Sequence, residues 1–475
     1  MSATASAPLC VDLDGTLIHT DLLLESLLQL LKRNPLYILL LPFWLLRGKA
    51  SLKAQIARRV KVNPSALPFN QELLAWLREQ RDSGRALWLC TASNYRLADA
   101  VAAHLQIFDG VIASTDDANM SGRAKAGQLC ERFGERRFEY CGNHRVDLHI
   151  WRRSEGAVVV NGGERLREAA SRVAPVRATF PGSRRSVRPY LRALRLHQWA
   201  KNLLVFVPLA AAHRVGDVAL LASSVQAFFA FGLCASSAYL LNDLLDLEAD
   251  RQHPRKRLRP FAAGDLSLLA GFAMAPALLV AAALLAWSVS PLFAMVLAAY
   301  YSLTLAYSFT LKRLVLIDAI ALAGLYTVRI IAGGVAVNVP LSDWLLLFAV
   351  FMFYSLALVK RYAELNAMRL KNKLTAAGRG YDVEDLPLLR SLGTSSGAAC
   401  VLVLALYVSS PAVAALYREP RAIWLLCVLL LYWISRMWLK AHRGQMHDDP
   451  VVFALKDRVS LCVGLLGLLA VLVAT

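Results

Sequence analysis

The second long apolar segment of the chain ends in Asn242-Asp243-Leu244-Leu245-Asp246-Leu247-Glu248-Ala249-Asp250. On one continuous helix, Asn242, Asp246 and Asp250 share a face, and Asp243 lies at its edge. Charged groups at the border of an apolar span are costly, so they mark a functional site. Hard oxygen ligands beside a cluster of cations are typical of a site for Mg²⁺ and a pyrophosphate. A solvated helix end is the alternative for the acids, and their helical spacing argues against it.

Basic residues follow this acidic stretch directly and suit the binding of phosphate oxygens. We expect Arg255, Lys256 and Arg259 to contact the substrate. Membrane topology alone also explains a basic run at this place, and for each cation taken singly that alternative stays open.

Composition excludes disorder and a single small soluble domain. The 475 residues are 57% hydrophobic and 18% charged, with a mean hydropathy of +0.45. The net charge of +19 would suit nucleic acid, anionic lipid or a phosphorylated substrate. Eight cysteines without a C-x-x-C pair predict neither a disulfide framework nor a zinc site.

Apolar segments fill the chain after residue 202, and most approach the ~20 residues that cross a bilayer. The nine segments are 202–213, 218–241, 266–288, 291–310, 315–336, 343–360, 396–416, 422–440 and 459–475. Four connecting loops carry nineteen Lys or Arg, and the four alternating loops carry three. This asymmetry predicts a multi-pass protein of a bacterial-type inner (plasma) membrane, with basic loops and N-terminal domain in the cytoplasm and the C-terminus outside. Because the cations lie beside membrane lipids, no nucleic-acid partner is expected.

The composition changes near residue 180. Residues 1–175 alternate short apolar runs with charged helical segments, which predicts an α/β Rossmann-like domain. Residues 176–190 are predicted as a linker, and residues 191–475 as an all-α transmembrane bundle of nine spans. No signal peptide is expected at the start of the chain.

One short apolar run lies inside the N-terminal domain. Leu36–Leu46 is too short to span and is flanked by cations, with Pro42 inside it. We expect residues 35–47 to form an interfacial segment that rests the domain on the membrane, in preference to a buried helix of a cap.

Polar residues follow three strand-like runs of the N-terminal domain. Asp12-Leu13-Asp14-Gly15-Thr16 comes after the first run, Thr91-Ala92-Ser93 after the second, and Gly142 to Asp147 after the third, with Lys125 before that run. The carboxyl edge of a parallel sheet is where ligands of such folds bind. Paired carboxylates there suit Mg²⁺ and nucleophilic attack on phosphorus.

Taken together, these elements resemble the haloacid dehalogenase (HAD) superfamily of phosphohydrolases over residues 7–165. The resemblance implies that Asp12 is the nucleophile, which forms an aspartyl phosphate. It also implies that Asp14 is the acid and base for the leaving group and then for water.

The same resemblance assigns the binding residues of this domain. Thr91 and Lys125 would hold the transferred phosphoryl group. Asp147, Asp12 and the carbonyl of Asp14 would hold Mg²⁺. Asn143 stands where many members have an acid, so weaker metal binding is expected.

The Asn-Asp-x-x-Asp-x-x-x-Asp pattern with nine spans resembles the UbiA-type superfamily of membrane prenyltransferases, over residues 188–475. The resemblance implies a Mg²⁺ site at Asn242, Asp243, Asp246 and Asp250, with the three aspartates catalytic. Members that move a prenyl group usually have a second acidic motif on a later span. Here that place holds Lys360-Arg361, which favours a phosphate-bearing substrate, although a Lys360–Glu364 ion pair is an alternative.

Further segments resemble the decaprenyl-phosphate phosphoribosyltransferase branch of that superfamily. They are Leu196–Asn202, Tyr307–Arg313 and Met446–Asp457, and the expected substrate-binding residues are Lys201, Asn202, Lys312, Arg329, Lys360 and Arg361. Arg329 lies deep in a span and needs either an acid, such as Asp318 on the same face, or a substrate phosphate.

This resemblance implies transfer of 5-phosphoribosyl from phosphoribosyl pyrophosphate to a polyprenyl phosphate, with Mg²⁺ as cofactor and a cell-wall arabinan precursor as product. The HAD domain would then remove the 5-phosphate. A prenyltransferase that uses a polyprenyl diphosphate and another acceptor is the first alternative, and a transporter or lipid-binding scaffold is the second. The sequence leaves open the prenyl length, the oligomeric state and the true phosphatase substrate.

Overall fold

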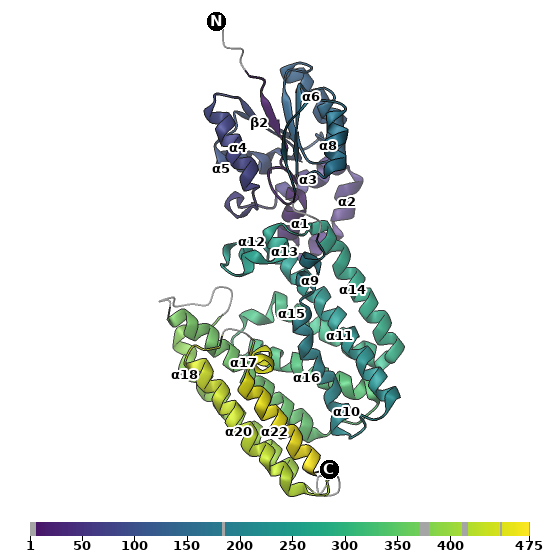
Figure 1. The fold of residues 1–475 in the computed structure, drawn as a ribbon, viewed down its shortest axis with the longest axis vertical. Coiled ribbons are helices and arrows are strands. Elements are labelled where there is room, and N and C mark those ends of the chain that lie inside the picture. The colour runs from purple at the N-terminus through teal and green to yellow at the C-terminus, as the bar shows by residue number, and fades with distance from the viewer. Residues whose placement is uncertain (1–5, 183–185, 371–379, 411–416, 447–448, 475) are drawn as a thin grey trace. The chain divides into compact units, whose positions relative to one another are not determined.

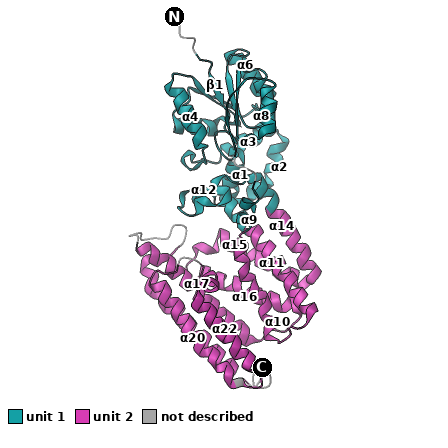
Figure 2. Cartoon of the chain, in the orientation of Figure 1, with its two compact units in different colours: residues 1–194, 239–274 teal, residues 195–238, 275–475 magenta. Residues whose placement is uncertain are grey.

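The computed structural model describes residues 6–182, 186–370, 380–410, 417–446 and 449–474. Two compact units make up the chain, and Figure 2 shows them in different colours. The first contains residues 1–194 and 239–274, and the second contains residues 195–238 and 275–475. The acidic stretch that begins at Asn242 therefore belongs to the same unit as the N-terminal domain.

A six-stranded parallel sheet forms the centre of the first unit, in the order β3-β2-β1-β4-β5-β6 (Figure 1). The strands are β1 (Leu9–Val11), β2 (Leu87–Asn94), β3 (Gly110–Ser114), β4 (Glu139–Gly142), β5 (Gly156–Val160) and β6 (Val176–Phe180). Leu9 of β1 is in register with Leu87 on one side and Glu139 on the other. Because the strands are parallel, the residues that follow β1, β2 and β4 meet at one edge.

Helices cover both faces of this sheet. They are α4 (Gln71–Asp82) and α5 (Tyr95–Leu105) on one face, and α6 (Arg123–Phe133), α7 (Leu148–Trp151) and α8 (Glu164–Ser171) on the other. Within β1, Leu9 and Val11 contribute to the first core and Cys10 to the second, because side chains alternate along a strand. This arrangement confirms the α/β Rossmann-like prediction.

The predicted linker starts later in the chain than expected. Val176–Phe180 form β6, which pairs with β5, and α9 (Arg188–Leu194) follows. The prediction of a linker is wrong for residues 176–180. An edge strand has one exposed side, so β6 alternates half-buried and exposed residues and lacks the apolar run of an inner strand.

A helical cap lies between β1 and α4. It consists of α1 (Leu22–Arg33), η1 (Pro35–Leu39), α2 (Leu41–Leu46) and α3 (Lys49–Ala57). Trp44 is buried in its small core, whereas large apolar side chains of η1 and α2 are exposed: Leu36, Ile38, Leu39, Phe43, Leu45 and Leu46. We call these six residues the apolar strip. The alternative of a buried cap helix does not hold for them.

The first unit also contains the segment that carries the acidic stretch. This segment comprises the end of α11 (Val218–Leu245), α12 (Leu247–Gln252), η5 (Lys256–Leu258), α13 (Pro260–Ala263) and the start of α14 (Leu268–Val289).

Helices form all the regular secondary structure of the described second unit. Besides parts of α11 and α14, they are η4 (Leu196–Phe206), α10 (Val207–Ala211), α15 (Pro291–Phe309), η6 (Leu311–Arg313), α16 (Ile317–Val337), α17 (Asp343–Arg369), η7 (Val383–Asp385), α18 (Leu386–Val408), α20 (Pro420–His442), α21 (Pro450–Lys456) and α22 (Arg458–Ala474). Ser290 and Ser342 cap α15 and α17 by accepting from backbone N–H groups at 3.0 and 3.2 Å.

Among the described residues, seven helices are long and apolar enough to span a membrane, or eight if α21 and α22, bent by 81°, form one span. The prediction of nine span-length helices is therefore wrong in its count. The expected first span, 202–213, divides between η4 and α10. Pro208 at the start of α10 lacks an N–H group and favours a helix start there.

Candidate active sites

The first candidate site follows β1, at the carboxyl edge of the sheet. Gly15 there has a φ of +72°, and a Cβ at this position would lie 2.1 Å from Asn143 Nδ2. Only glycine fits both the backbone conformation and this close approach. The turn at Gly15 therefore lets the chain after Asp14 pass directly beside the loop that follows β4.

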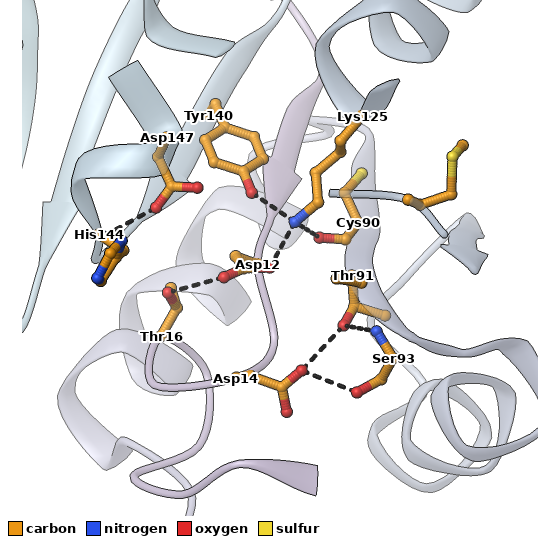
Figure 3. A network of polar contacts seen from close by, with 12 residues as sticks. Asp12, Asp14, Thr16, Cys90, Thr91, Ser93, Lys125, Tyr140, His144 and Asp147 are labelled. Atoms are coloured by element: carbon orange, nitrogen blue, oxygen red, sulfur yellow. Dashed lines mark hydrogen bonds and ion pairs between the residues drawn. The ribbon is translucent and has the colours of Figure 1, made fainter. Parts of the chain in front are cut away.

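Asp12 is held by a buried lysine. Lys125 Nζ donates to Asp12 Oδ1 at 2.8 Å, to the Cys90 carbonyl at 3.1 Å and to the Tyr140 hydroxyl at 2.9 Å (Figure 3). Burial acts to lower the pKa of Lys125, but the carboxylates of Asp12 and Asp147 raise it further than burial lowers it. Lys125 thus presents a fixed positive charge beside Asp12, and its role in phosphoryl binding stays a prediction from the resemblance.

Asp14 has a different environment. Its carboxylate accepts from Leu22 N at 2.8 Å, Ser93 Oγ at 2.8 Å and Thr91 Oγ1 at 3.3 Å. Burial, with the neighbouring Asp21 and Asp12 carboxylates, raises the pKa of Asp14 to about 7. A carboxyl group with that pKa can give and take a proton near neutral pH.

Asp147 lies across the site from Asp14. One oxygen, Oδ2, accepts from the backbone N–H groups of Asn143 and His144 at 3.0 and 2.9 Å. Burial and the Asp12 carboxylate raise the pKa of Asp147 to about 6.

The pair of carboxylates at Asp12 and Asp147 fits a divalent cation, because such an ion would relieve their repulsion. Among the described residues, no group of three or more His, Cys, Asp or Glu side chains gathers in a way that could hold a metal. Other ligands would therefore have to be backbone or amide oxygens. The carbonyl of Asp14 was expected in this role, and the Asn143 side chain also lines the site.

A cavity of about 330 Å³ opens over these residues. Asp12, Asp14, Ser93, Lys125, Asn143 and Asp147 line it, together with Asp21, Leu23 and Lys53 of the cap region. Thr91 is fully buried and bonds Asp14, and the hydroxyl residues that line the cavity are Ser93 and Ser121. Lys53 donates to the Ala92 carbonyl at 2.5 Å and to Asn119 Oδ1 at 2.7 Å. No local sequence pattern indicates a role for Lys53, because this residue lies on the separate helix α3.

The second candidate site is the acidic stretch. Helix α11 ends at Leu245 and α12 begins at Leu247, and Asp246 between them has φ −102° and ψ 14°. The acidic stretch is therefore not one continuous helix as expected. The main-chain hydrogen bonds from Asp246 N to Asn242 O at 2.9 Å and from Asp250 N to Asp246 O at 2.8 Å nevertheless keep a helical spacing across the break. Asp246 Oδ1 accepts from Lys32 of α1 at 2.8 Å.

Asp243 and Asp250 converge on a common cation. Arg259 Nη1 lies 3.0 Å from Asp243 Oδ1 and 2.6 Å from Asp250 Oδ2, and both aspartates are 2% exposed. Two buried carboxylates therefore share one positive group, Arg259, and the metal-binding role expected of this stretch stays a prediction. Asn242 is half-buried at the end of α11, and Arg255 and Lys256 are exposed.

The third candidate site lies in the second unit, where two lysines meet one carboxylate. Lys201 of η4 and Lys360 of α17 each donate to Asp449 Oδ2 at 3.0 Å, and the Tyr326 hydroxyl donates to Asp449 Oδ1 at 2.9 Å. Lys201 Nζ also lies 5.4 Å from the centre of the Tyr326 ring. The structure thus brings together two of the predicted phosphate-binding residues.

Arg329 of α16 extends this cluster. It donates to Asn202 Oδ1 at 3.0 Å and to the Tyr300 hydroxyl at 2.8 Å, and its guanidinium lies 5.7 Å from the Tyr326 ring centre. Asn202 is 1% exposed, and its side-chain Nδ2 is a buried donor without a hydrogen-bond partner in the described part of the chain. We call Lys201, Arg329 and Lys360 the basic cluster.

Two other predicted residues lie elsewhere. Arg361 is buried and bonds Asp318, Glu364 and the Tyr307 hydroxyl, so an intraprotein network holds its guanidinium. Asp318 therefore pairs with Arg361 and does not serve Arg329. Lys312 is half-buried in η6, and Lys360 bonds Asp449, which makes Asp449 a partner that the Lys360–Glu364 alternative did not include.

Asp449 and Tyr326 are the residues of this site that sequence reasoning missed. Asp449 lies within the quoted segment Met446–Asp457, but nothing in its spacing connects it to lysines 248 and 89 residues away. His447 and Asp448 of that segment lie outside the described residues.

The comparison with known families decides the class of the membrane part. Residues 203–457 match the model of the UbiA prenyltransferase family. The chain belongs to this family. Its three aspartates from Asp243 to Asp250 and its basic cluster all fall within the matched range or next to it.

Two curated relatives extend this assignment. An uncharacterized protein of Sinorhizobium fredii is 39% identical over 97% of this chain and 89% of its own length. A decaprenyl-phosphate phosphoribosyltransferase of Mycolicibacterium smegmatis is 37% identical over 57% of this chain and 86% of its own length. The chain is thus similar to a phosphoribosyltransferase over somewhat more than half of its length, and to the Sinorhizobium protein over nearly all of it.

Solved structures are more distant. A UbiA homolog from Archaeoglobus fulgidus, bound to GPP and Mg²⁺, matches 60% of this chain and 99% of its own at 15% identity, with a TM-score of 0.46. A HAD family hydrolase from Salmonella enterica matches 37% of this chain and 69% of its own at 14% identity, with a TM-score of 0.28.

Proposed function

We propose that this UbiA family member transfers 5-phosphoribosyl from phosphoribosyl pyrophosphate to a polyprenyl phosphate, and that its HAD-like domain removes the 5-phosphate of the lipid product. The observation that carries the proposal is the basic cluster. Lys201 and Lys360 both bond Asp449, and Arg329 lies beside Tyr326, which bonds the same carboxylate. Lys360 stands where prenyl-transferring members usually have an acid. Such a cluster favours a substrate with an additional phosphate group. The similarity to phosphoribosyltransferases supports the same reading.

In the transfer step, an oxygen of the lipid phosphate attacks C1 of the ribose, and the bond from C1 to the pyrophosphate breaks. The attacking oxygen is already an anion, so no proton has to be removed. The ribose develops positive charge at C1 in the transition state, and the pyrophosphate leaves with the electron pair. The basic cluster binds a phosphate group. Asp243, Asp246 and Asp250 act at the pyrophosphate group of phosphoribosyl pyrophosphate.

In the hydrolytic step, Asp12 attacks the 5-phosphate, and the bond from phosphorus to the ribose oxygen breaks. Asp14 gives its proton to that oxygen, which its pKa of about 7 permits. Asp14 then takes a proton from water, whose oxygen attacks phosphorus and releases phosphate from Asp12. Lys125 holds the phosphoryl oxygens throughout. Mg²⁺, when bound at Asp12 and Asp147 or at Asp243 and Asp250, supplies positive charge that offsets the phosphate charge at each site.

We further propose that both sites act on the cytoplasmic side of a bacterial plasma membrane. The charge asymmetry of the loops supports this orientation. The apolar strip would rest on the same membrane surface, because its six side chains are 51 to 85% exposed and Lys32, Arg33, Arg47 and Lys49 flank it. A tethered phosphatase would then meet the lipid head at a high effective concentration.

Purified full-length protein, incubated with Mg²⁺, labelled phosphoribosyl pyrophosphate and decaprenyl phosphate, tests the proposal. We expect label in a lipid product and release of pyrophosphate. A parallel reaction with a polyprenyl diphosphate and an aromatic acceptor tests the alternative. If product forms only in the second reaction, the protein is a prenyltransferase and the proposed function is wrong. If product forms in neither reaction, both activities are excluded for these substrates.

A further inference from the structure

The strongest unexplained contact of the first unit joins the cap to the acidic stretch. Arg251 of α12 forms a two-pronged ion pair with Glu25 of α1, with Nη2 to Oε1 at 2.6 Å and Nη1 to Oε2 at 2.9 Å. The Arg251 and Glu25 side chains are 7% and 5% exposed. A bidentate pair with this burial fixes the geometry of both partners.

Arg251 makes two more contacts that fix its position. Its Nε donates to the Ala262 carbonyl of α13 at 3.0 Å, and its Nη1 approaches the Ala66 carbonyl of the cap region at 3.3 Å. One guanidinium therefore ties together α1, α12, α13 and residue 66. Removing Glu25 alone would leave a buried charge without its counterion, which is destabilising locally.

Two other contacts connect the N-terminal domain to the segment that carries the acidic stretch. Lys32, near the end of α1, donates to Asp246 at 2.8 Å. Gly264, after α13, has a φ of +80°, and a Cβ there would lie 2.7 Å from the Cβ of His19. Backbone of the acidic segment thus approaches the loop that precedes α1 as closely as glycine allows.

Helix α1 also touches the phosphatase site. The backbone N–H of Leu22, its first residue, donates to Asp14 Oδ1 at 2.8 Å. The helix has 12 residues, so it spans about 18 Å from the carboxyl group of the phosphatase acid to the acidic stretch. Glu25 lies one turn from its start and Lys32 one residue from its end.

We propose that α1 couples the two sites, with Glu25 as a positioning residue that acts through Arg251 on the neighbouring Asp250. Occupation of the phosphatase site shifts Leu22, α1 transmits the shift, and the Glu25–Arg251 pair sets the position of Asp250. Binding at either site then changes binding at the other by the same factor. The expected effect on Mg²⁺ binding at Asp250 rests on the proposed function. The coupling of the two sites through α1 does not.

Hydrogen exchange on the full-length protein in nanodiscs tests the link. The probe is orthovanadate, a phosphate analogue, which we expect to bind at Asp12 if the proposed function holds. We expect vanadate to slow amide exchange in residues 247–262 of the wild type, and we expect Glu25→Gln to speed that exchange and to remove the vanadate effect. Vanadate that protects only residues near Asp12 and leaves 247–262 unchanged in the wild type would overturn the proposal.

The matched control is Glu139→Gln, which breaks another buried Arg–Glu pair of the same unit, Arg85–Glu139 at 2.7 Å. This control should leave exchange in 247–262 and its response to vanadate as in the wild type. In transfer assays, Glu25→Gln should raise the Mg²⁺ concentration for half-maximal rate about tenfold, as loss of a residue that orients metal ligands does, and Glu139→Gln should not. An equal effect of both variants would reduce Glu25 to a stabilising role. If the wild-type protein shows no transfer activity, the proposed function is refuted. The hydrogen-exchange result then still tests the coupling through α1.

Discussion

Tyr326 donates its hydroxyl hydrogen bond to Asp449 at 2.9 Å, from a helix more than one hundred residues earlier in the chain. Asp449 also accepts from Lys201 and Lys360, so this carboxylate holds the lysines of the basic cluster in place. We expect Asp449→Asn to lower kcat/KM for transfer at least tenfold, because loss of a buried charge partner costs about 2 kcal/mol or more. Asp457→Asn, which loses a partly exposed pair with Arg436, is the control and should stay within twofold.

Lys360 gives a second prediction. Lys360→Ala should raise KM for one phosphate-bearing substrate about tenfold and change kcat little, since a charge-assisted hydrogen bond contributes about 1.5–3 kcal/mol. Steady-state kinetics with each substrate varied in turn measures this. Arg390→Ala removes an exposed cation from α18 and should leave both KM values unchanged. Unchanged KM values in Lys360→Ala as well would limit Lys360 to its ion pair.

The acidic stretch gives the third prediction. Asp246→Asn and Asp250→Asn should each abolish transfer, because each removes a charge that we assign to metal binding. Asp246 is half-buried and pairs with a partly exposed lysine, so its variant should unfold at the temperature of the wild type. Transfer rates across a Mg²⁺ titration decide the assignment. Near-normal activity of either variant at limiting Mg²⁺ would show that its carboxylate is no ligand.

A fourth prediction concerns pH. Asp14 has a pKa of about 7, so hydrolysis should fall about tenfold for each pH unit above 7, as the proton donor is lost. The free energy of unfolding also decreases as the pH rises. Because the folded state binds this proton more tightly than the unfolded chain does, the contribution of Asp14 is greatest below pH 4 and is lost as the pH rises through 7.

Asp14→Asn checks both effects. The variant should lack the alkaline limb of the pH profile, with little activity left, and should melt higher than the wild type at pH 8 but not at pH 4. A wild-type profile that stays flat from pH 6 to 9 would contradict the role of Asp14 as acid.

The fifth prediction separates the two activities. Asp12→Asn should leave phosphoribosyl transfer intact, but the 5-phosphorylated lipid should accumulate where the wild type gives the dephosphorylated lipid. Mass spectrometry of the extracted lipids distinguishes these products. Asp117→Asn, an exposed carboxylate of the same domain, is the control. The same product from wild type and Asp12→Asn would mean that the HAD-like domain acts on another phosphate.

The sequence alone determined those features of the protein that depend on short-range patterns of residues. Acids after a strand-like run located Asp12, Asp14 and Asp147 at one sheet edge, since parallel strands must end together. Apolar length located most of the spans, because a bilayer demands about 20 apolar residues whatever the packing. A cation inside a span marked Arg329 as a candidate functional residue, because a buried charge needs a partner.

Tertiary structure alone decided which distant side chains meet. Asp246 pairs with Lys32 across 214 residues of chain, and Asp449 accepts from Lys201 and Lys360 across 248 and 89 residues. The buried Glu25–Arg251 pair was equally invisible, because neither residue has an unusual local sequence. Periodicity reports which face of a helix is apolar, but the partner of a polar side chain depends on how helices pack, and no local pattern encodes that packing.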